Sequence, residues 1–144
     1  MKILLVRHAS AEENHSLGDA ARGLDAEGRE KFRKRARKLA KNFSIKRIVV
    51  SPLVRAVQTA EILAEASDAL EVIVRGELAG SERDLIRLLG EFSSGTALVG
   101  HNPSMSDAAR QITGNSELPD MKKGCGWAVE KTGEHWEITW RSDM

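Results

Sequence analysis

Short apolar runs alternate with longer amphipathic stretches along most of this chain, and that alternation restricts the fold more than any other feature of the sequence. The apolar runs predict buried strands at residues 2–7 and 46–50 and two further strands at residues 71–74 and 96–99. The stretches between them carry apolar side chains at helical spacing and predict helices at residues 24–43, 52–66, 82–89 and 103–112. Four consecutive strand–helix units are typical of a mainly parallel sheet that is covered by helices on both faces.

The C-terminal tail breaks this alternation. Residues 126–130 and 134–140 predict two strands that are joined by a turn at residues 131–133. Trp136, Ile138 and Trp140 alternate along the second of these strands, which favours a place for all three in the core. The expected fold class is therefore α/β, a three-layer α/β/α sandwich with a mainly parallel sheet and a C-terminal antiparallel hairpin. Because 144 residues suit one core, we expect residues 1–144 to form a single domain.

Residues 29–41 place eight Lys and Arg side chains on the first predicted helix. Such a run is compatible with nucleic-acid binding, but the apolar stripe of this helix faces the core and leaves the cations on its solvent-exposed faces. The whole chain balances 22 Lys and Arg against 21 Asp and Glu, so no overall charge attracts nucleic acid or an anionic membrane. We expect a solvated surface here and no nucleic-acid partner; a docking surface for an acidic partner is the alternative.

Cysteine content and hydropathy bear on the cellular compartment. The chain has one cysteine, Cys125, so it cannot form an internal disulfide, as suits a reducing compartment. Since Cys125 lies between two glycines, ahead of a late strand, we expect its thiol to be structural rather than nucleophilic. The first apolar run has four residues before Arg7, and no run approaches the length of a membrane span. These features predict a cytoplasmic protein without a membrane partner.

Charged and polar side chains follow three of the four predicted strands. Arg7 and His8 end the first strand, Arg55 lies in the first turn of the helix after the second strand, and His101 follows the fourth strand. Carboxyl ends of parallel strands meet at one edge of a sheet, where α/β proteins bind ligands. We therefore expect these four side chains to lie close together.

Helix starts are predicted next to two of these segments. Ser51 is expected to be an N-cap with Pro52 as the first helical residue, and Asn102 and Pro103 repeat that pattern. The N-terminus of a helix presents free N–H groups to an anion. Arginine matches phosphate oxygens in a bidentate way, a neutral histidine can attack phosphorus, and a second histidine can stabilise the developing charge. The constellation predicts a phosphate site with its own nucleophile.

The segments that carry this constellation resemble the three signature blocks of the histidine phosphatase superfamily, which has a phosphoglycerate mutase-like fold. They are Arg7-His8-Ala9, Ser51-Pro52-x-x-Arg55-Ala56-x-Gln58-Thr59-Ala60 and Gly100-His101-Asn102-Pro103, and Arg22-x-Leu24-x-x-x-Gly28 resembles the start of the family's first helix. Order and spacing agree from residue 2 to about residue 113. The short chain and the third block look most like the SixA-type phosphohistidine phosphatase branch.

The resemblance implies a role for each matching residue. His8 matches the nucleophile that becomes phosphorylated, and Arg7, Arg55 and His101 match the residues that bind the phosphoryl oxygens. The implied chemistry uses no metal and no other cofactor. Larger family members use a carboxylate after the third strand as general acid, and Glu77 is the first candidate for that role, with Glu82 as the alternative.

Three further residues are candidate substrate ligands. Asn102 adjoins His101, Arg22 is expected either to bind ligand or to pair with a carboxylate, and Ser10 either contacts the phosphate or shapes its loop. One departure from the family pattern is Ala9, which stands where the family has glycine. Alanine resists a positive φ, so we expect the turn after His8 to be conformationally restricted.

The predicted function is a metal-independent phosphatase that acts through a phosphohistidine intermediate on His8. The expected substrate is phosphohistidine on a protein, because the chain is too short for long insertions over the pocket. The alternatives are a phosphatase of small phosphomonoesters and, from another class, a non-catalytic module that binds phosphate or a phosphoprotein.

Overall fold

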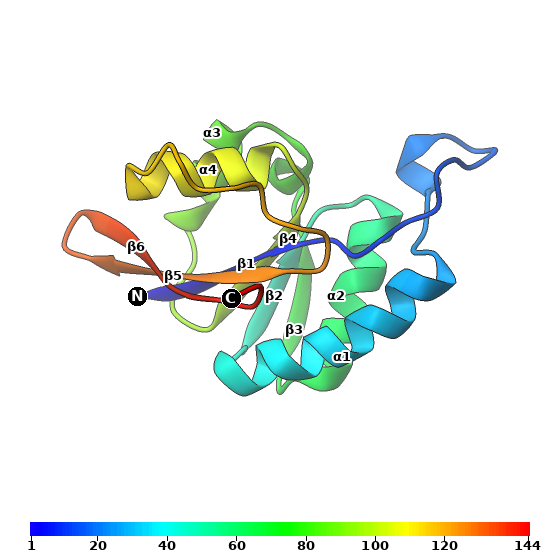
Figure 1. The fold of residues 1–144 in the computed structure, drawn as a ribbon, viewed down its shortest axis with the longest axis horizontal. Coiled ribbons are helices and arrows are strands. Elements are labelled where there is room, and N and C mark those ends of the chain that lie inside the picture. Colours follow the sequence, from blue (N-terminus) through cyan, green and yellow to red (C-terminus); the bar gives the residue numbers. More distant parts are fainter.

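The computed structural model describes all residues, 1–144, and contains one six-stranded sheet in the order β3-β2-β4-β1-β5-β6 (Figure 1). The strands are β1 (Lys2–Arg7), β2 (Arg47–Val50), β3 (Glu71–Val74), β4 (Thr96–Gly100), β5 (Gly126–Thr132) and β6 (His135–Arg141). The first four are parallel to one another, whereas β5 runs antiparallel to β1, and β6 runs antiparallel to β5. The sheet is therefore mainly parallel and ends in an antiparallel hairpin, as predicted.

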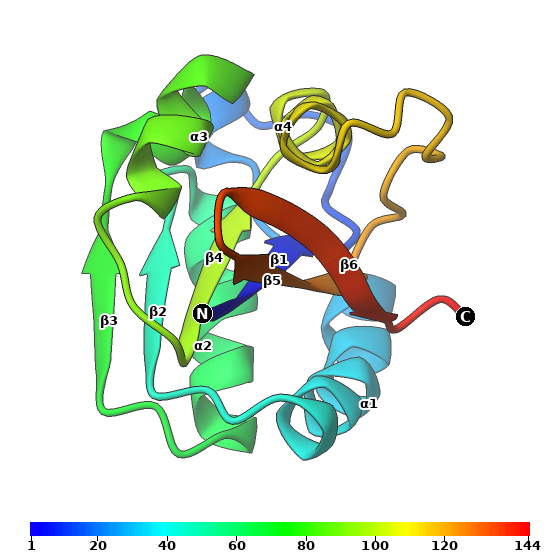
Figure 2. The same ribbon diagram turned by 90° about the vertical axis from the view of Figure 1, so that its left-hand side faces the viewer.

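Helices cover both faces of this sheet, so the α/β/α layering is also confirmed (Figures 1 and 2). The α-helices are α1 (Ala26–Asn42), α2 (Val54–Ala66), α3 (Glu82–Leu89) and α4 (Ser104–Thr113), and two 3₁₀ turns are η1 (Asp19–Ala21) and η2 (Gly76–Ala79). Alternate residues of β1 face opposite layers. Leu4 and Val6 pack with α1 and α2, whereas Ile3 and Leu5 pack with α3 and α4. None of the helices is long and apolar enough to cross a membrane.

Three predicted helix starts are wrong by one or two residues, and hydrogen bonding explains why. Helix α1 begins at Ala26 and not at Leu24, because the Asp25 side chain caps it. Helix α2 begins at Val54 and not at Pro52, and Ser51 is not its N-cap. The Ser51 hydroxyl instead accepts a hydrogen bond from the Leu53 N–H (3.2 Å) and contacts a histidine ring at the strand ends. Helix α4 begins at Ser104, one residue after Pro103, and the Asn102 side chain accepts from the Ser106 N–H (3.2 Å).

The C-terminal hairpin departs from the predicted alternation at one residue. The pairing of β5 with β6 shifts register between Ala128 and Val129, so Val129 pairs with Ile138 and Ala128 with Trp140. The extra residue turns Trp140 to the other face of the sheet. Trp136 and Ile138 therefore pack on the α3 and α4 side, and Trp140 packs on the α1 and α2 side.

The first turn of α1 is fastened to the loop that follows β1. Asp25 caps the helix by accepting from the Gly28 N–H (2.6 Å), and its other carboxylate oxygen accepts from the Ser10 hydroxyl (2.8 Å). Any Cβ at Gly28 would lie 2.1 Å from the Ser10 carbonyl oxygen, so only glycine allows this approach. The helix thereby determines the path of the chain just after His8.

Candidate phosphate-binding site

The carboxyl ends of β1, β2 and β4 lie side by side in the sheet, since β4 pairs with both β1 and β2. His8 directly follows β1, and its side chain is largely buried. Its backbone N–H donates to the Gly100 carbonyl (3.0 Å). His8 Nδ1 lies 2.7 Å from the Ala9 carbonyl oxygen. A carbonyl only accepts hydrogen bonds, so this contact assigns the proton to Nδ1 and leaves the lone pair of Nε2 unprotonated.

Burial keeps the His8 imidazole neutral. Its pKa is lowered to about 3, mainly by desolvation and further by the positive charges of Arg55 and Arg7 and by the His101 ring. At neutral pH the ring is therefore uncharged, which is the state that a nucleophile at Nε2 requires.

His101 faces His8 from the end of β4. The two ring centroids are 5.1 Å apart, and His101 Nε2 lies 2.7 Å from the Ser51 hydroxyl oxygen. That hydroxyl accepts the Leu53 N–H, and its own proton can be donated to Nε2. In that arrangement the single N–H of the neutral His101 ring lies on Nδ1. His101 Nδ1 is buried and has no partner, and desolvation lowers the pKa of this ring to about 4.

Arg7 presents a second unsatisfied donor. Its Nη1 donates to the Met121 carbonyl (2.9 Å), while its Nε is buried without a partner. Burial lowers the pKa of this guanidinium. Buried donors are rarely left unpaired in folded proteins, so the unpartnered nitrogens of Arg7 and His101 are candidates for hydrogen bonds to an oxyanion.

Arg55 lies in the first turn of α2, close to both histidines. It is largely buried, and its positive charge lowers the pKa of both His8 and His101. Its guanidinium is held from above by η1: Nη1 donates to the Asp19 carbonyl (3.0 Å), and Nη2 lies 3.2 Å from the Asp19 carboxylate. The negative charge of Asp19 raises the pKa of His101 and so partly offsets the effect of burial. No motif in the sequence predicted that Asp19 would lie at this site.

We expect Asp19→Asn to strengthen the binding of inorganic phosphate about two- to fivefold at low salt, as for the loss of one exposed ion pair. The Asp19 carboxylate shares the Arg55 guanidinium and adds negative charge where an anion would bind. The inhibition constant of phosphate measures the effect, with Asp68→Asn as an exposed control at the other end of the sheet. Weaker phosphate binding by Asp19→Asn would mean that this carboxylate organises Arg55 rather than competing for it.

The other residues of the second block hold the site together. Thr59 donates its hydroxyl proton to the Arg55 carbonyl (2.8 Å) and accepts from the Ala9 N–H (3.1 Å), which joins α2 to the turn after His8. Gln58 accepts from the Leu24 N–H (2.7 Å). Ala9 fits this turn without strain, because its φ is not positive.

Asn102 lies beside the site, but its side chain is occupied by the protein itself. Its amide donates to the Met121 carbonyl (3.0 Å), and its oxygen accepts from the Ser106 hydroxyl (2.7 Å). Ser106 in turn accepts from the Met121 N–H (2.8 Å). The Met121 carbonyl also accepts from Arg7, so this network positions Arg7. One N–H of the Asn102 amide is used in it, so Asn102 cannot offer both of its N–H groups to a substrate.

Ser10 and Arg22 likewise have protein partners. The Ser10 hydroxyl donates to Asp25, which favours the loop-shaping role over contact with a phosphate. Arg22 donates to the Glu12 carbonyl (2.6 Å) and pairs with Asp19 (2.7 Å), so it takes the carboxylate-pairing alternative. Asp19 therefore forms ion pairs with both Arg22 and Arg55.

Glu77 lies in η2, after β3, and forms an ion pair with Arg75. Arg75 also pairs with Glu91 (2.8 Å). The Arg75 hydrogen bonds hold the pKa of the Glu77 carboxyl below its ordinary value. A carboxylate that is ionised and paired is a poor proton donor at neutral pH, so the structure weighs against Glu77 as the general acid.

The two buried histidines make stability depend on pH. Both bind protons more weakly in the folded state than in the unfolded chain, where the pKa of histidine is about 6.5. Between that value and their folded values the unfolded chain binds more protons, so the free energy of unfolding falls as the pH drops from 7 to 4.5. The expected loss is on the order of 2 kcal/mol for each ring. Urea unfolding at both pH values measures it, and His8→Gln/His101→Gln should lose less over the same interval. An equal loss in both proteins would contradict the assignment of buried neutral rings.

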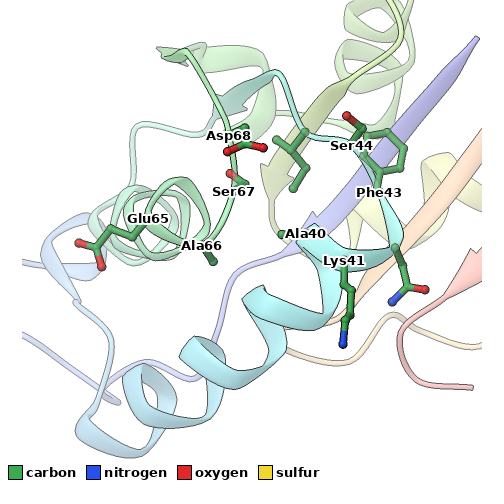
Figure 3. A pocket seen from close by; sticks show the side chains of 10 residues that line it. Ala40, Lys41, Phe43, Ser44, Glu65, Ala66, Ser67 and Asp68 are labelled. Carbon is green, nitrogen blue, oxygen red and sulfur yellow. The ribbon is translucent and has the colours of Figure 1, made fainter.

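A surface pocket of about 460 Å³ opens at the opposite edge of the sheet (Figure 3). The C-terminal ends of α1 and α2 line it, and its lining includes the charged residues Lys41, Glu65 and Asp68 (Figure 3). It contains no histidine and no arginine. Arg7, His8, Arg55 and His101 do not line this pocket, so it is not part of the candidate site.

Comparison with known proteins agrees with this geometry. The family model of the histidine phosphatase superfamily (branch 1) matches residues 3–102. No curated protein matches the sequence. Among solved structures, the protein histidine phosphatase SixA in complex with tungstate shares 22% identity with a TM-score of 0.84, over 98% of this chain and 96% of that one.

Two relatives of other specificity have the same fold. The α-ribazole phosphatase of Shigella flexneri has 15% identity and a TM-score of 0.75, over 96% of this chain and 94% of its own. The mycobacterial glucosyl-3-phosphoglycerate phosphatase with VO3 has 14% identity and a TM-score of 0.77, over 96% and 97%. At these identities the likeness concerns the fold, whereas the sequence match covers more than half of the chain and includes all three strand ends of the site. The chain belongs to the histidine phosphatase superfamily.

Proposed function

We propose that this protein is a metal-independent phosphatase in which His8 Nε2 accepts the phosphoryl group, and that its substrate is phosphohistidine on a protein. One observation carries the proposal. His8 is a buried neutral ring whose Nδ1 is tied to the Ala9 carbonyl, so Nε2 is free among the positive charges of Arg7 and Arg55.

The reaction follows from these groups. The Nε2 lone pair attacks phosphorus, a P–N bond forms to His8, and the bond to the leaving nitrogen or oxygen breaks with its electron pair. Water then attacks phosphorus, the P–N bond to His8 breaks, and phosphate leaves. Arg7, Arg55 and the Nδ1–H of His101 bind the non-bridging oxygens, whose charge is spread in the transition state. The leaving imidazole takes up a proton from solvent, the attacking water releases a proton to solvent, and the electron pair of the P–N bond returns to His8 Nε2.

The phosphohistidine substrate is supported by the likeness to SixA, which spans nearly the full length of both chains. An imidazole leaving group can be protonated before the P–N bond breaks, so this substrate places little demand on a general acid. That agrees with the paired state of Glu77. The likeness to α-ribazole and glucosyl-3-phosphoglycerate phosphatases supports the second candidate, a phosphatase of small phosphomonoesters.

The deciding experiment compares phosphate release from a phosphohistidine-bearing carrier protein with release from a panel of small sugar and nucleotide-derived phosphates. Both series include a chelator. We expect release from the carrier protein to be faster and to persist with chelator present. Faster release from a small ester would favour the second candidate. Binding of phosphate without any release would indicate a non-catalytic module, and loss of activity with chelator would contradict the metal-independent scheme.

Glu77→Gln tests the general acid directly. Because its carboxylate is ionised in the pair with Arg75, we expect the variant to keep kcat within about threefold on a phosphohistidine protein and on an aryl phosphate, far below the 10²–10⁴-fold that a general acid contributes. Glu91→Gln removes the other partner of Arg75 and is the matched control. A loss of 10²-fold or more, confined to Glu77→Gln and to the ester, would restore Glu77 as the acid.

A further inference from the structure

A positively charged groove lies directly beside the candidate site. It has a volume of about 220 Å³, and its floor includes Ala9 and Ser10, the two residues that follow His8. Lys31 and Arg35 line it from α1, and Lys123 lines it from the segment between α4 and β5. Figure 2 shows that segment passing from α4 to the side of α1. Residues far apart in the sequence thus place three cations around one groove.

The cations are held in a constant position relative to the nucleophile. Arg35 Nη1 donates to the Lys123 carbonyl (2.6 Å), which ties α1 to the segment that carries Lys123. The next residue, Gly124, donates its N–H to the carbonyls of Arg7 (3.0 Å) and His8 (3.1 Å). Gly124 has φ 75°, and a Cβ there would lie 2.9 Å from Arg35 Nη1. The positive φ of Gly124 favours glycine at this turn, which places Lys123 next to the site.

The charge of the groove is only partly neutralised. Lys31 pairs with Glu27 (2.5 Å), whereas Arg35 and Lys123 form no ion pair. Asp25 is the other nearby carboxylate, and it accepts from Ser10 and the Gly28 N–H. Helix α1 as a whole carries eight Lys and Arg against two Glu, although the chain has a net charge of +1. Positive charge is thus concentrated on one helix, and the end of that helix nearest the site forms the groove.

We infer that the groove of Lys31, Arg35 and Lys123 is a docking surface for an acidic segment of the phosphohistidine-bearing substrate protein. This inference rests on the proposed function and names the kind of surface that the substrate presents. Carboxylates that flank the phosphorylated histidine would meet the three cations while the phosphoryl group reaches His8. Complementary charge of this kind raises the rate of association and selects partners. Nucleic acid fits less well, because Phe32, the aromatic residue of the groove, is fully buried and offers no face on which a base could stack.

The test uses two fluorescent peptides that carry a non-hydrolysable phosphonate in place of the phosphate on histidine. One peptide has Glu residues on both sides of that group, and the other has Lys residues. Fluorescence anisotropy measures the Kd of each for the wild-type protein. We expect the acidic peptide to bind about tenfold more tightly, and this preference to shrink as NaCl rises from about 50 to about 300 mM.

Two double variants localise the effect. Lys31→Gln/Lys123→Gln removes two cations of the groove, and Lys34→Gln/Lys41→Gln removes two exposed cations of α1 outside it. The preference for the acidic peptide should be lost in the first variant and kept in the second. Equal Kd values for the two peptides, or equal losses in both variants, would overturn the inference, as would a single-stranded oligonucleotide that binds the groove more tightly than the acidic peptide.

The binding readout is independent of turnover. If the acidic peptide is preferred but no phosphohistidine protein is hydrolysed, the proposed function fails and the docking surface remains. If hydrolysis occurs without any preference for acidic flanks, the docking surface fails and the proposed function remains.

Discussion

His8→Ala should lower kcat by on the order of 10⁴-fold or more, the size of effect seen when an enzyme loses the nucleophile of its covalent intermediate. The variant lacks the only atom that the scheme provides for attack on phosphorus, since the neighbouring ring of His101 is engaged by Ser51 at Nε2. Initial rates on a phosphohistidine carrier protein measure the loss.

The fold should survive this substitution. The hydrogen bond that His8 makes through its side chain goes to the carbonyl of its own neighbour, Ala9, so no distant segment depends on it. Circular dichroism and binding of inorganic phosphate are the controls, and both should resemble the wild type. A folded variant with a rate near that of the wild type would refute the role of His8.

The second largest effect is expected from Arg55→Ala, which should lower kcat/KM by roughly 10³-fold, the lower end of what an arginine contributes to phosphoryl transfer. Arg55 is largely buried and is one of two guanidinium groups whose charge acts on both histidines. Its removal takes away a bidentate donor for the phosphoryl oxygens. Steady-state kinetics with a phosphohistidine protein, together with phosphate inhibition, measure the loss.

Arg55 also holds η1 through Asp19, so a loss of activity needs a control for the position of that turn. Arg55→Lys keeps the charge but not the planar fork, and we expect an intermediate rate. Asp19→Asn keeps the guanidinium and breaks the charge pair, and it should bind phosphate at least as well as the wild type. If Arg55→Ala and Arg55→Lys both keep nearly full activity, the phosphate site does not depend on Arg55.

Hydrophobic patterning predicted most of this fold, because buried strands and amphipathic helices are local features of the sequence. The strand at Glu71–Val74 and the helix at Glu82–Leu89 have the predicted bounds. The bulge in the hairpin was not predictable, since it depends on how Ala128 and Trp140 pair across two strands. A one-residue shift in pairing moves a side chain to the opposite face.

The same distinction holds for the site. The strand ends brought Arg7, His8, Arg55 and His101 together as predicted, because parallel strands align their carboxyl ends. Partners from loops were missed. The Met121 carbonyl accepts a hydrogen bond from Arg7 although the two residues are 114 positions apart in the sequence. A backbone carbonyl is present in every residue, so no residue type predicts such a contact.

Two mistaken helix caps have a common cause. Ser51 and Asn102 have the right residue types for an N-cap, but each is used by the site. The Ser51 hydroxyl orients His101, and the Asn102 amide holds the Met121 carbonyl. At both residues a long-range hydrogen bond replaces the N-cap role that the residue type favours. Such conflicts between local preference and tertiary structure are expected at functional sites.

Trapping the phosphorylated enzyme is the most direct test of whether His8 accepts the phosphoryl group. A phosphohistidine carrier protein labelled with ³²P would be mixed with the wild-type protein and quenched in alkali, which preserves phosphohistidine, and the label would be located by peptide mapping. We predict label on His8 that forms and decays at rates consistent with turnover, with none on the His8→Ala variant. Turnover without any label on His8, or label on another residue, would contradict it.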